Sequence, residues 1–291
     1  MCTKRSLAAP RDKGDGISWN VLSDRGLMID AASYPFTEAS APDSTETFLA
    51  MARDLGFARS ASSRVLDFGC GYGDVVREFR ARGFDAEGVD IVPFWSEAKD
   101  RYWEEREPVP KALRAHLHVA ELNPYHLPFP EASFDLIHSS QVFEHVMDYR
   151  TAFRELGRVL KPDGLSIHIF PARWRPLEPH VFVPLGSVLR ARPWLALWAL
   201  LGIRNQFQRG LRWREVVQRN HAYLVNGTNY PTHRLIRRWA REASVRVRFA
   251  PALLLAHSTG RGGRLARHVP FPGGSLLYET FGRRTMILLR A

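Results

Sequence analysis

The chain has 291 residues, of which 45% are hydrophobic, so it can bury a large core as one elaborated domain or as a domain with an inserted cap. Its two cysteines, Cys2 and Cys70, are too few for a disulfide framework, which favours a reducing compartment. No apolar run follows Lys4, Arg5 and the other early basic residues, so we expect no secretory signal and a cytoplasmic protein.

The formal net charge of +11 is divided unevenly along the chain. Residues 171–291 hold 21 Arg, no Lys and four acidic residues, a net charge of +17, and residues 1–170 therefore carry −6. Such an asymmetry can mark a face that meets phosphates, acidic glycans or anionic lipid, because clustered positive charge concentrates anions. A general preference for Arg over Lys in the genome explains the same numbers, and composition alone does not separate the two explanations.

The first half of the chain shows the alternation of strands and helices that is typical of βαβ units and a parallel sheet. Residues 1–42 show no sustained period and are interpreted as a loose N-terminal arm. Asp43 followed by Glu46 is typical of a helix start, and the apolar residues after them predict a helix over 44–56. The strands that we expect next are 65–68, 86–90, 116–120, 134–139 and 165–170, and the helices are 74–82, 94–105 and 148–160.

The alternation stops at residue 171. Residues 171–231 contain several prolines and an apolar run from Trp194 to Ile203, which is shorter than the ~20 residues that span a membrane, so we predict an inserted cap or an interfacial helix. Thr232 is expected to cap a further helix, and alternating apolar residues at 245–249 and 286–288 predict two closing strands. The predicted organisation is an arm (1–42), a core (43–170), an inserted cap or substrate region (171–231) and a part that completes the sheet (232–291).

The strongest functional feature follows the first strand of the core. Asp67 ends that strand, and Gly69, Gly71 and Gly73 follow at alternating positions before a helix start. Glycines at such a turn let a ligand approach the backbone amides, since they carry no side chain. Dinucleotide-binding turns space their last glycine further away, as G-x-G-x-x-G, and have no acid directly before the turn. A purely structural glycine turn is the alternative interpretation.

Polar residues also follow the next two strands. Asp90 ends the second strand, where a carboxylate can accept hydrogen bonds from both hydroxyls of a ribose. Glu121, Leu122 and Asn123 follow the third strand, where an adenine would meet a polar side chain and a backbone amide. We favour Leu122 and Asn123 over Glu121 for that role. Two further segments, 127–135 and 141–146, come after them.

With these segments the chain resembles the class I S-adenosylmethionine-dependent methyltransferases, in particular the broad family that acts on small molecules and glycans. The resemblance covers about residues 60–170: residues 67–73 look like the first motif of the family, Asp90 like its ribose-binding acid, residues 127–135 like its next signature and residues 160–164 like the turn into strand five. One departure is that members often carry Asp where Glu121 or Asn123 stands, with one residue fewer before the 127–129 signature.

The resemblance implies an α/β fold of the Rossmann-like, doubly wound kind. Its seven-stranded sheet is mostly parallel, with an antiparallel last strand that residues 285–290 would supply, and here a helical cap would be inserted after strand five. The implied cofactor is S-adenosyl-L-methionine. The residues that we expect to bind it are Asp67, Gly69, Cys70, Gly71, Gly73, Asp90, Ile91, Leu122, Asn123, Ser139 and Gln141.

Methyl transfer from a sulfonium is an in-line displacement with a good leaving group, so it depends mainly on the alignment of the acceptor. An alcohol acceptor also benefits from a general base, for which His145, His180 and His126 are the candidates. Each of them can instead be a structural histidine. In similar proteins a Glu-His pair like Glu144-His145 recurs after strand four, where it either ties a loop or takes part in catalysis. We predict no metal ligands.

We interpret the chain as a methyltransferase that O-methylates a glycan or another small molecule, with peripheral contact to an anionic membrane as a further expectation. An anionic or sugar-bearing acceptor would suit the guanidinium and aromatic groups of the inserted region, although Trp194 and Trp198 are slightly better explained as core residues. An RNA methyltransferase that uses the Arg-rich half is an alternative, but no separate RNA-binding module is visible. The third alternative is a non-catalytic, cofactor-binding scaffold. The guanidinium and aromatic groups of the inserted region are those of Arg173, Trp174, Arg175, Trp194, Trp198 and Trp213.

Overall fold

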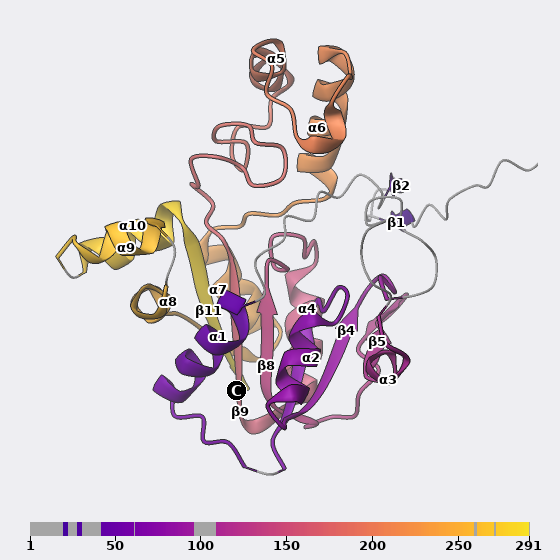
Figure 1. Cartoon of the computed structure of the whole chain (residues 1–291), viewed down its shortest axis with the longest axis vertical. Helices are drawn as coiled ribbons and strands as arrows, with labels where there is room; N and C mark the ends of the chain where they lie inside the picture. The colour runs from indigo at the N-terminus through magenta and orange to yellow at the C-terminus, as the bar shows by residue number, and fades with distance from the viewer. Residues whose placement is uncertain are drawn as a thin grey trace, which may run out of the picture.

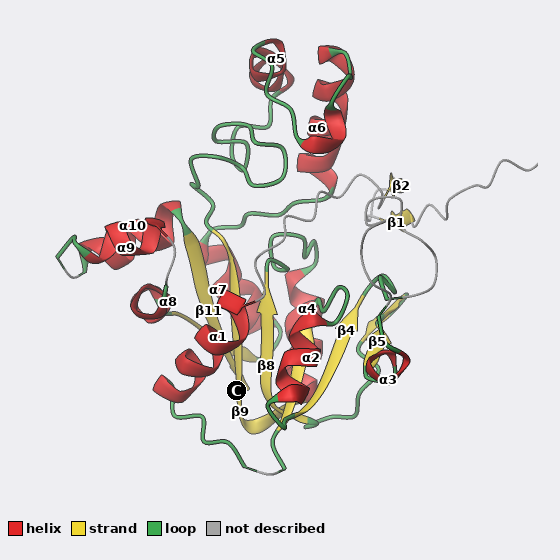
Figure 2. Cartoon of the chain, viewed as in Figure 1, coloured by secondary structure: helices red, strands yellow, loops and turns green. Residues whose placement is uncertain are grey.

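The computed structural model describes residues 20–22, 28–30, 42–60, 62–95, 109–258, 261–270 and 272–290. Figures 1 and 2 show a central sheet flanked by helices. Most of the predicted arm lies outside the described residues; within it, β1 (Asn20–Leu22) and β2 (Met28–Asp30) form a short antiparallel pair. The predicted helix over 94–105 also lies outside them, apart from its first two residues.

The main sheet has the strand order β10-β11-β9-β8-β3-β4-β5. Neighbours from β9 through to β5 pair in parallel, whereas β11 is antiparallel to both β9 and β10. The predicted sheet, mostly parallel with an antiparallel last strand, is therefore confirmed. The strands are β3 (Arg64–Phe68), β4 (Asp85–Asp90), β5 (Leu117–Val119), β8 (Phe134–Ser140), β9 (Leu160–Pro171), β10 (Val245–Phe249) and β11 (Arg283–Arg290).

The strand order reverses beside β3, the first strand of the sheet in the chain. The chain moves outward from β3 through β4 to β5 and then returns to β8 on the other side of β3. Open α/β sheets bind their ligands in the crevice beyond the carboxyl ends of the strands at such a reversal. Ligand-binding residues are therefore expected among those that follow β3, β4, β5 and β8.

Helices cover both faces of the sheet, and the strand residues alternate between them. Val65 and Leu136 pack on the face of α1 (Pro42–Asp54), α2 (Asp74–Ala81) and α8 (Pro251–His257). Their neighbours Leu66 and Ile137 pack on the opposite face, with α4 (Tyr149–Val159) and α7 (His233–Glu242). Successive strand residues point to opposite faces, so a sheet covered on both sides needs apolar residues at consecutive positions. Such apolar runs predicted these strands.

Two of the predicted helix starts are fixed by side-chain caps. The Asp148 carboxylate accepts hydrogen bonds from the backbone N–H groups of Arg150 and Thr151 at the start of α4. The Thr232 hydroxyl accepts one from the backbone N–H of Leu235 at the start of α7, as predicted. These caps satisfy N–H groups that have no partner inside the helix.

The region 171–231 contains α5 (Arg192–Leu200), the 3₁₀ turn η2 (Gln206–Gln208) and α6 (Trp213–Asn226). Side chains of α5 and α6 form a small core of their own, which includes Leu195, Val216 and Leu224. In Figure 1 these helices stand beyond the edge to which the arrowhead of β8 points, the edge where the parallel strands end. No helix in the described part of the chain is long and apolar enough to cross a membrane.

Several short elements were not predicted. The helices α8, α9 (Arg261–Arg267) and α10 (Gly273–Phe281) separate β10 from β11 and lie to one side of the sheet in Figure 1. A short helix, α3 (Lys111–Arg114), precedes β5. A hairpin of β6 (Glu121–Leu122) and β7 (Tyr125–His126) follows β5.

Candidate functional site

The glycine turn lies between β3 and α2, and its three predicted glycines have different surroundings. All have positive φ angles, of 80° at Gly69, 51° at Gly71 and 79° at Gly73. A Cβ atom would stand 2.3 Å from Val142 Cγ2 at Gly69 and 2.8 Å from Leu117 Cδ1 at Gly73. A Cβ at Gly71 would meet nothing within 4 Å. Gly69 and Gly73 thus let the turn pack against its neighbours, whereas Gly71 faces open space.

Asp90, at the end of β4, is joined to this turn. Its Oδ2 accepts a hydrogen bond of 2.9 Å from the Gly71 N–H, and its Oδ1 accepts one of 2.7 Å from the Ile91 N–H. Burial raises the pKa of the Asp90 carboxyl to about 6, against the opposing effect of these hydrogen bonds, and the nearby charge of Asp67 raises it further. Asp67 is itself buried and accepts a hydrogen bond of 2.7 Å from His138 Nδ1.

The other predicted residues around the turn differ in exposure. Cys70 is buried in the same hydrophobic core as Val65, and burial raises the pKa of its thiol well above the usual value. Ile91 and Leu122 are exposed hydrophobic residues that follow β4 and β5. The Ala120 N–H donates to the Asp90 carbonyl oxygen at 2.9 Å, so the hairpin that carries Leu122 and Asn123 begins beside the end of β4.

At the end of β8, Ser139 and Gln141 have different environments. The Ser139 hydroxyl lies in the interior and forms a hydrogen bond of 2.8 Å with Nδ1 of His168. Gln141 has a φ of 61°, which turns the chain out of the strand, and its backbone N–H donates to the Ile169 carbonyl. Its Oε1 is buried and has no hydrogen-bond partner among the described residues. The structure thus gives Gln141 an acceptor that a ligand can use, while Ser139 is engaged by the core.

The structure brings two of the three candidate histidines together. The ring centroids of His145 and His180 lie 4.9 Å apart, and the Tyr223 ring contacts both. The third, His126, lies on β7 and pairs with Glu155 on α4, its Nδ1 3.0 Å from Oε2. His145 and His180 form the histidine pair of this site.

A buried carboxylate, Glu178, holds His180. Its Oε1 accepts hydrogen bonds of 2.8 Å from His180 Nδ1 and from the Tyr230 hydroxyl, and its Oε2 accepts 2.8 Å bonds from the N–H groups of His180 and Val181. The short spacing of Glu178 and His180 is visible in the sequence, but no sequence signal indicates Tyr230. The loop that follows β9 is therefore built around this carboxylate.

The loop that follows β8 carries the other half of the pair. His145 Nδ1 lies 2.8 Å from the Gly227 carbonyl oxygen, which can only accept, so Nδ1 carries the proton. The Asn229 N–H donates to the Glu144 carbonyl oxygen. Two consecutive residues of the loop are thus tied to the segment that follows α6, which fixes the inserted region over this edge of the sheet.

The acid and base groups of this region have shifted pKa values. Burial raises the pKa of Glu144 to about 7 and lowers that of His145 to about 3, and the nearby His180 adds to the second shift. Burial disfavours the charged forms of both His180 and Glu178. Their mutual attraction and hydrogen bond outweigh this effect, so that the pKa of His180 is raised and that of Glu178 is lowered. Such opposed shifts in a cluster of groups are typical of functional sites.

The aromatic and basic groups proposed for an acceptor are only partly at the surface. The rings of Trp194 and Trp198 pack edge to face, with their centroids 5.6 Å apart, and both contact the small core of α5 and α6. Trp194 Nε1 donates a hydrogen bond to the Pro184 carbonyl. Trp174 and Trp213 are exposed, and the Arg173 guanidinium lies 6.0 Å from the Trp174 ring. The interpretation of Trp194 and Trp198 as core residues agrees with these contacts.

A protein-family model described as a methyltransferase domain matches residues 44–243. The chain belongs to this methyltransferase family. An uncharacterized methyltransferase of Bacillus subtilis is 33% identical to it over 45% of this chain and 51% of that protein. A malonyl-[acyl-carrier protein] O-methyltransferase of Halorhodospira halophila is 35% identical over 35% of this chain and 32% of that protein. The chain thus spans about half of the length of the first relative and about a third of the second.

The structure is also similar to that of an S-adenosylmethionine-dependent methyltransferase from Mesorhizobium loti. The match covers 87% of this chain and 99% of the other, with a TM-score of 0.48 and 15% sequence identity. The predicted family is confirmed by the family match, and with it S-adenosyl-L-methionine as the cofactor.

The surroundings of the glycines predict different effects for two alanine substitutions. Gly69→Ala places a Cβ against Val142 in a turn with positive φ and is expected to lower the free energy of unfolding by more than about 2 kcal/mol. Gly71→Ala meets only the strain of positive φ and should cost about 1 kcal/mol. Urea denaturation of both variants measures the difference, and equal losses would contradict the packing of this turn.

Proposed function

We propose that this methyltransferase transfers a methyl group from S-adenosylmethionine to an oxygen atom of a small-molecule or glycan acceptor. The observation that carries the proposal is the placement of the glycine turn and the histidine pair at one edge of the sheet. Gly69 contacts the loop after β8 through Val142, and that loop carries His145. A cofactor held by the turn and an acceptor held at the histidines would therefore be neighbours.

The residues at the turn fit the cofactor. Gly71 leaves open space beside its backbone, and the Asp90 carboxylate at the end of β4 is an acceptor suited to ribose hydroxyls. The Gln141 Oε1, buried without a protein partner among the described residues, offers an acceptor to the polar groups of the methionine part. Leu122 and Asn123 on the hairpin after β5 are placed to border the adenine. Bound S-adenosylmethionine supplies an electrophilic methyl group on a sulfonium.

The histidine pair is the polar group best placed to bind and help deprotonate an acceptor hydroxyl. His180 is oriented through Nδ1 by Glu178, and His145 through Nδ1 by the Gly227 carbonyl, so the protein fixes both rings. His126 is engaged by Glu155 on α4 and is not part of this proposal. The chemistry asked of the pair is modest, because alignment of the acceptor supplies most of the catalysis in such a displacement.

The proposed acceptor is anionic or bound at an anionic membrane surface. The net charge of +17 over residues 171–291 supports this, as does an exposed apolar strip on and after α5. Leu197, Leu200 and Leu201 are exposed there, next to a chain rich in Arg. A basic surface with exposed apolar residues is typical of peripheral contact with lipid. The alternative acceptor, RNA, is supported by the charge alone.

Asp90 provides the first test. Asp90→Ala should weaken the binding of S-adenosylmethionine by about 1.5–3 kcal/mol, because it removes a charged acceptor. Since the pKa of Asp90 is raised to about 6, wild-type affinity should also fall as the pH is lowered through 6, where the carboxyl takes up a proton. Calorimetry between pH 5 and about 7 measures both effects. Asp90→Asn should show no such pH dependence; unchanged affinity in Asp90→Ala would refute the role of Asp90.

The histidine pair provides the second test. His180→Ala should lower the rate of methyl transfer by about 100-fold or more while the affinity for S-adenosylmethionine stays the same. The matched control is His257→Ala, which also removes a histidine paired with a carboxylate, Asp54, but on α8. Transfer of labelled methyl groups to a panel of hydroxylated small molecules and glycans measures the rate. Equal rates in the two variants would reassign His180 to structure.

A further inference from the structure

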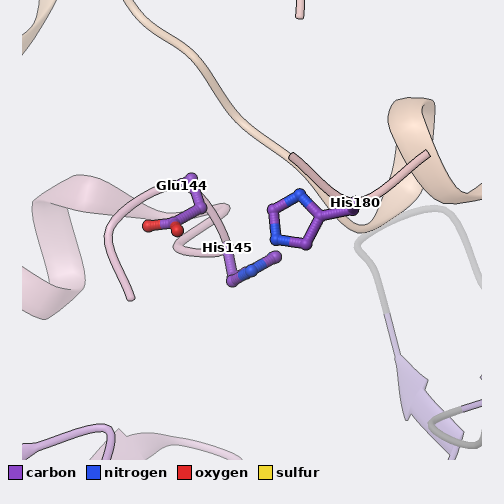
Figure 3. A group of neighbouring side chains, drawn as sticks. All are labelled: Glu144, His145 and His180. Atoms are coloured by element: carbon purple, nitrogen blue, oxygen red, sulfur yellow. The ribbon is translucent and has the colours of Figure 1, made fainter. Parts of the chain in front are cut away.

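We infer that Glu144, His145 and His180 form a binding site for a divalent cation of the zinc type. Each residue offers one ligand atom, and these atoms all lie within 4.8 Å of one another. Figure 3 shows the three side chains gathered from two segments, the loop after β8 and the loop after β9. The sequence predicts no metal ligands, and in the chain His180 is separated from the other two residues by α4 and β9.

The Glu144 carboxyl is the strongest indication of a ligand. Its side chain is fully buried, and neither Oε1 nor Oε2 has a hydrogen-bond partner among the described residues. An unpartnered buried carboxylate is costly, and a bound cation removes that cost by supplying the missing charge and bonds. The nearby His180 and Arg283 favour the charged form of Glu144, but neither forms a hydrogen bond with its carboxyl oxygens.

Both histidines are held in the way that metal-binding histidines usually are. Such a histidine donates the N–H of its second nitrogen to a carboxylate or a carbonyl, which fixes the ring and leaves the other nitrogen for the metal. His180 Nδ1 is bonded to Glu178 at 2.8 Å, and His145 Nδ1 to the Gly227 carbonyl at 2.8 Å. Glu178 is held in turn by the Tyr230 hydroxyl. We therefore assign the metal-binding role to Nε2 of each ring.

The ligand types and their spacing indicate the class of metal. Two imidazoles and one carboxylate suit zinc and its neighbours in the first transition row, whereas magnesium prefers an all-oxygen shell. Zinc binds such ligands at about 2.0–2.2 Å, which puts tetrahedral ligand atoms roughly 3.4 Å apart. Side-chain shifts of about one ångström would therefore bring the three ligand atoms to the spacing that a bound zinc ion needs.

Three protein ligands leave one coordination position open to water or to another oxygen ligand. The cluster is also the histidine pair that we assign to the acceptor. We assign the open position to an oxygen atom of the acceptor, an assignment that rests on the proposed function. A cation there would orient this oxygen and lower the pKa of its hydroxyl, which the histidines alone would otherwise have to achieve. Binding of the metal itself does not depend on this assignment.

The test is equilibrium binding of Zn²⁺ to the full chain after removal of metal by a chelator, with no S-adenosylmethionine present. We expect one tightly held Zn²⁺ per chain, and a loss of affinity of about 100-fold or more in Glu144→Gln and in His180→Asn. Glu144→Gln keeps the shape of the side chain and removes a buried charge, so it should remain folded, which thermal denaturation checks. Binding of Co²⁺ to the wild type should give the visible absorption of a four-coordinate site.

The control is His118→Ala, which disrupts a half-buried group of two histidines around Glu87. His116 lies 3.1 Å and His118 2.7 Å from the Glu87 carboxylate. This variant should bind Zn²⁺ like the wild type. No binding by the wild type, or binding lost in His118→Ala and retained in Glu144→Gln and His180→Asn, would overturn the site. Binding of S-adenosylmethionine, measured separately, tests the proposed function, so either can fail while the other stands.

Discussion

The hydrogen bond from the Gly71 N–H to the Asp90 carboxylate joins the ends of two neighbouring strands, and the candidate site is built outward from it. It forms because β3 and β4 are parallel and end at the same edge, where Gly71 adopts a positive φ that glycine tolerates without strain. The order of the strands does the rest. With β8 on the other side of β3, the loops after β3, β4 and β8 meet at one edge.

The inserted region completes this edge from the other side. The backbone of the loop after β8 is tied to the chain that follows α6, through Asn229 to Glu144 and through His145 to Gly227. These bonds hold the loop that carries Glu144 and His145 against the segment after α6, and Tyr223 of α6 contacts both histidine rings. In the proposed function, the groups that bind the cofactor come from the ends of the sheet strands, and the inserted region contributes to the acceptor site. The family match does not identify the acceptor.

The sequence predicted the features that depend on local patterns. Consecutive apolar residues such as Val65 and Leu66 marked the strands, since the two faces of the sheet are both buried, and Thr232 marked a helix start. The glycine turn was found because it directly follows a strand, and Asp90 because it ends one. The helices α9 and α10 were missed because they are short and contain glycines, such as Gly262, Gly263 and Gly273, and α8 was missed because seven residues are too few to show a clear helical period.

The contacts around the histidine pair could not be predicted in the same way. His145 meets His180, and Glu178 meets Tyr230, only after the chain has folded across β9 and the inserted helices. Spacing in the sequence carries no information on such contacts. Nothing in the sequence separates His126 from the other two candidates, His145 and His180. Its pairing with Glu155 is visible only in the structure.

The central claim is that the edge formed by Gly71, Asp90 and Gln141 binds S-adenosylmethionine. Calorimetric titration of the purified chain with S-adenosylmethionine, with its demethylated product and with NAD tests it most directly. We expect the first two to bind at one site per chain and NAD not to bind. Binding of NAD in place of the other two would contradict the account and would indicate a dinucleotide site at the same edge.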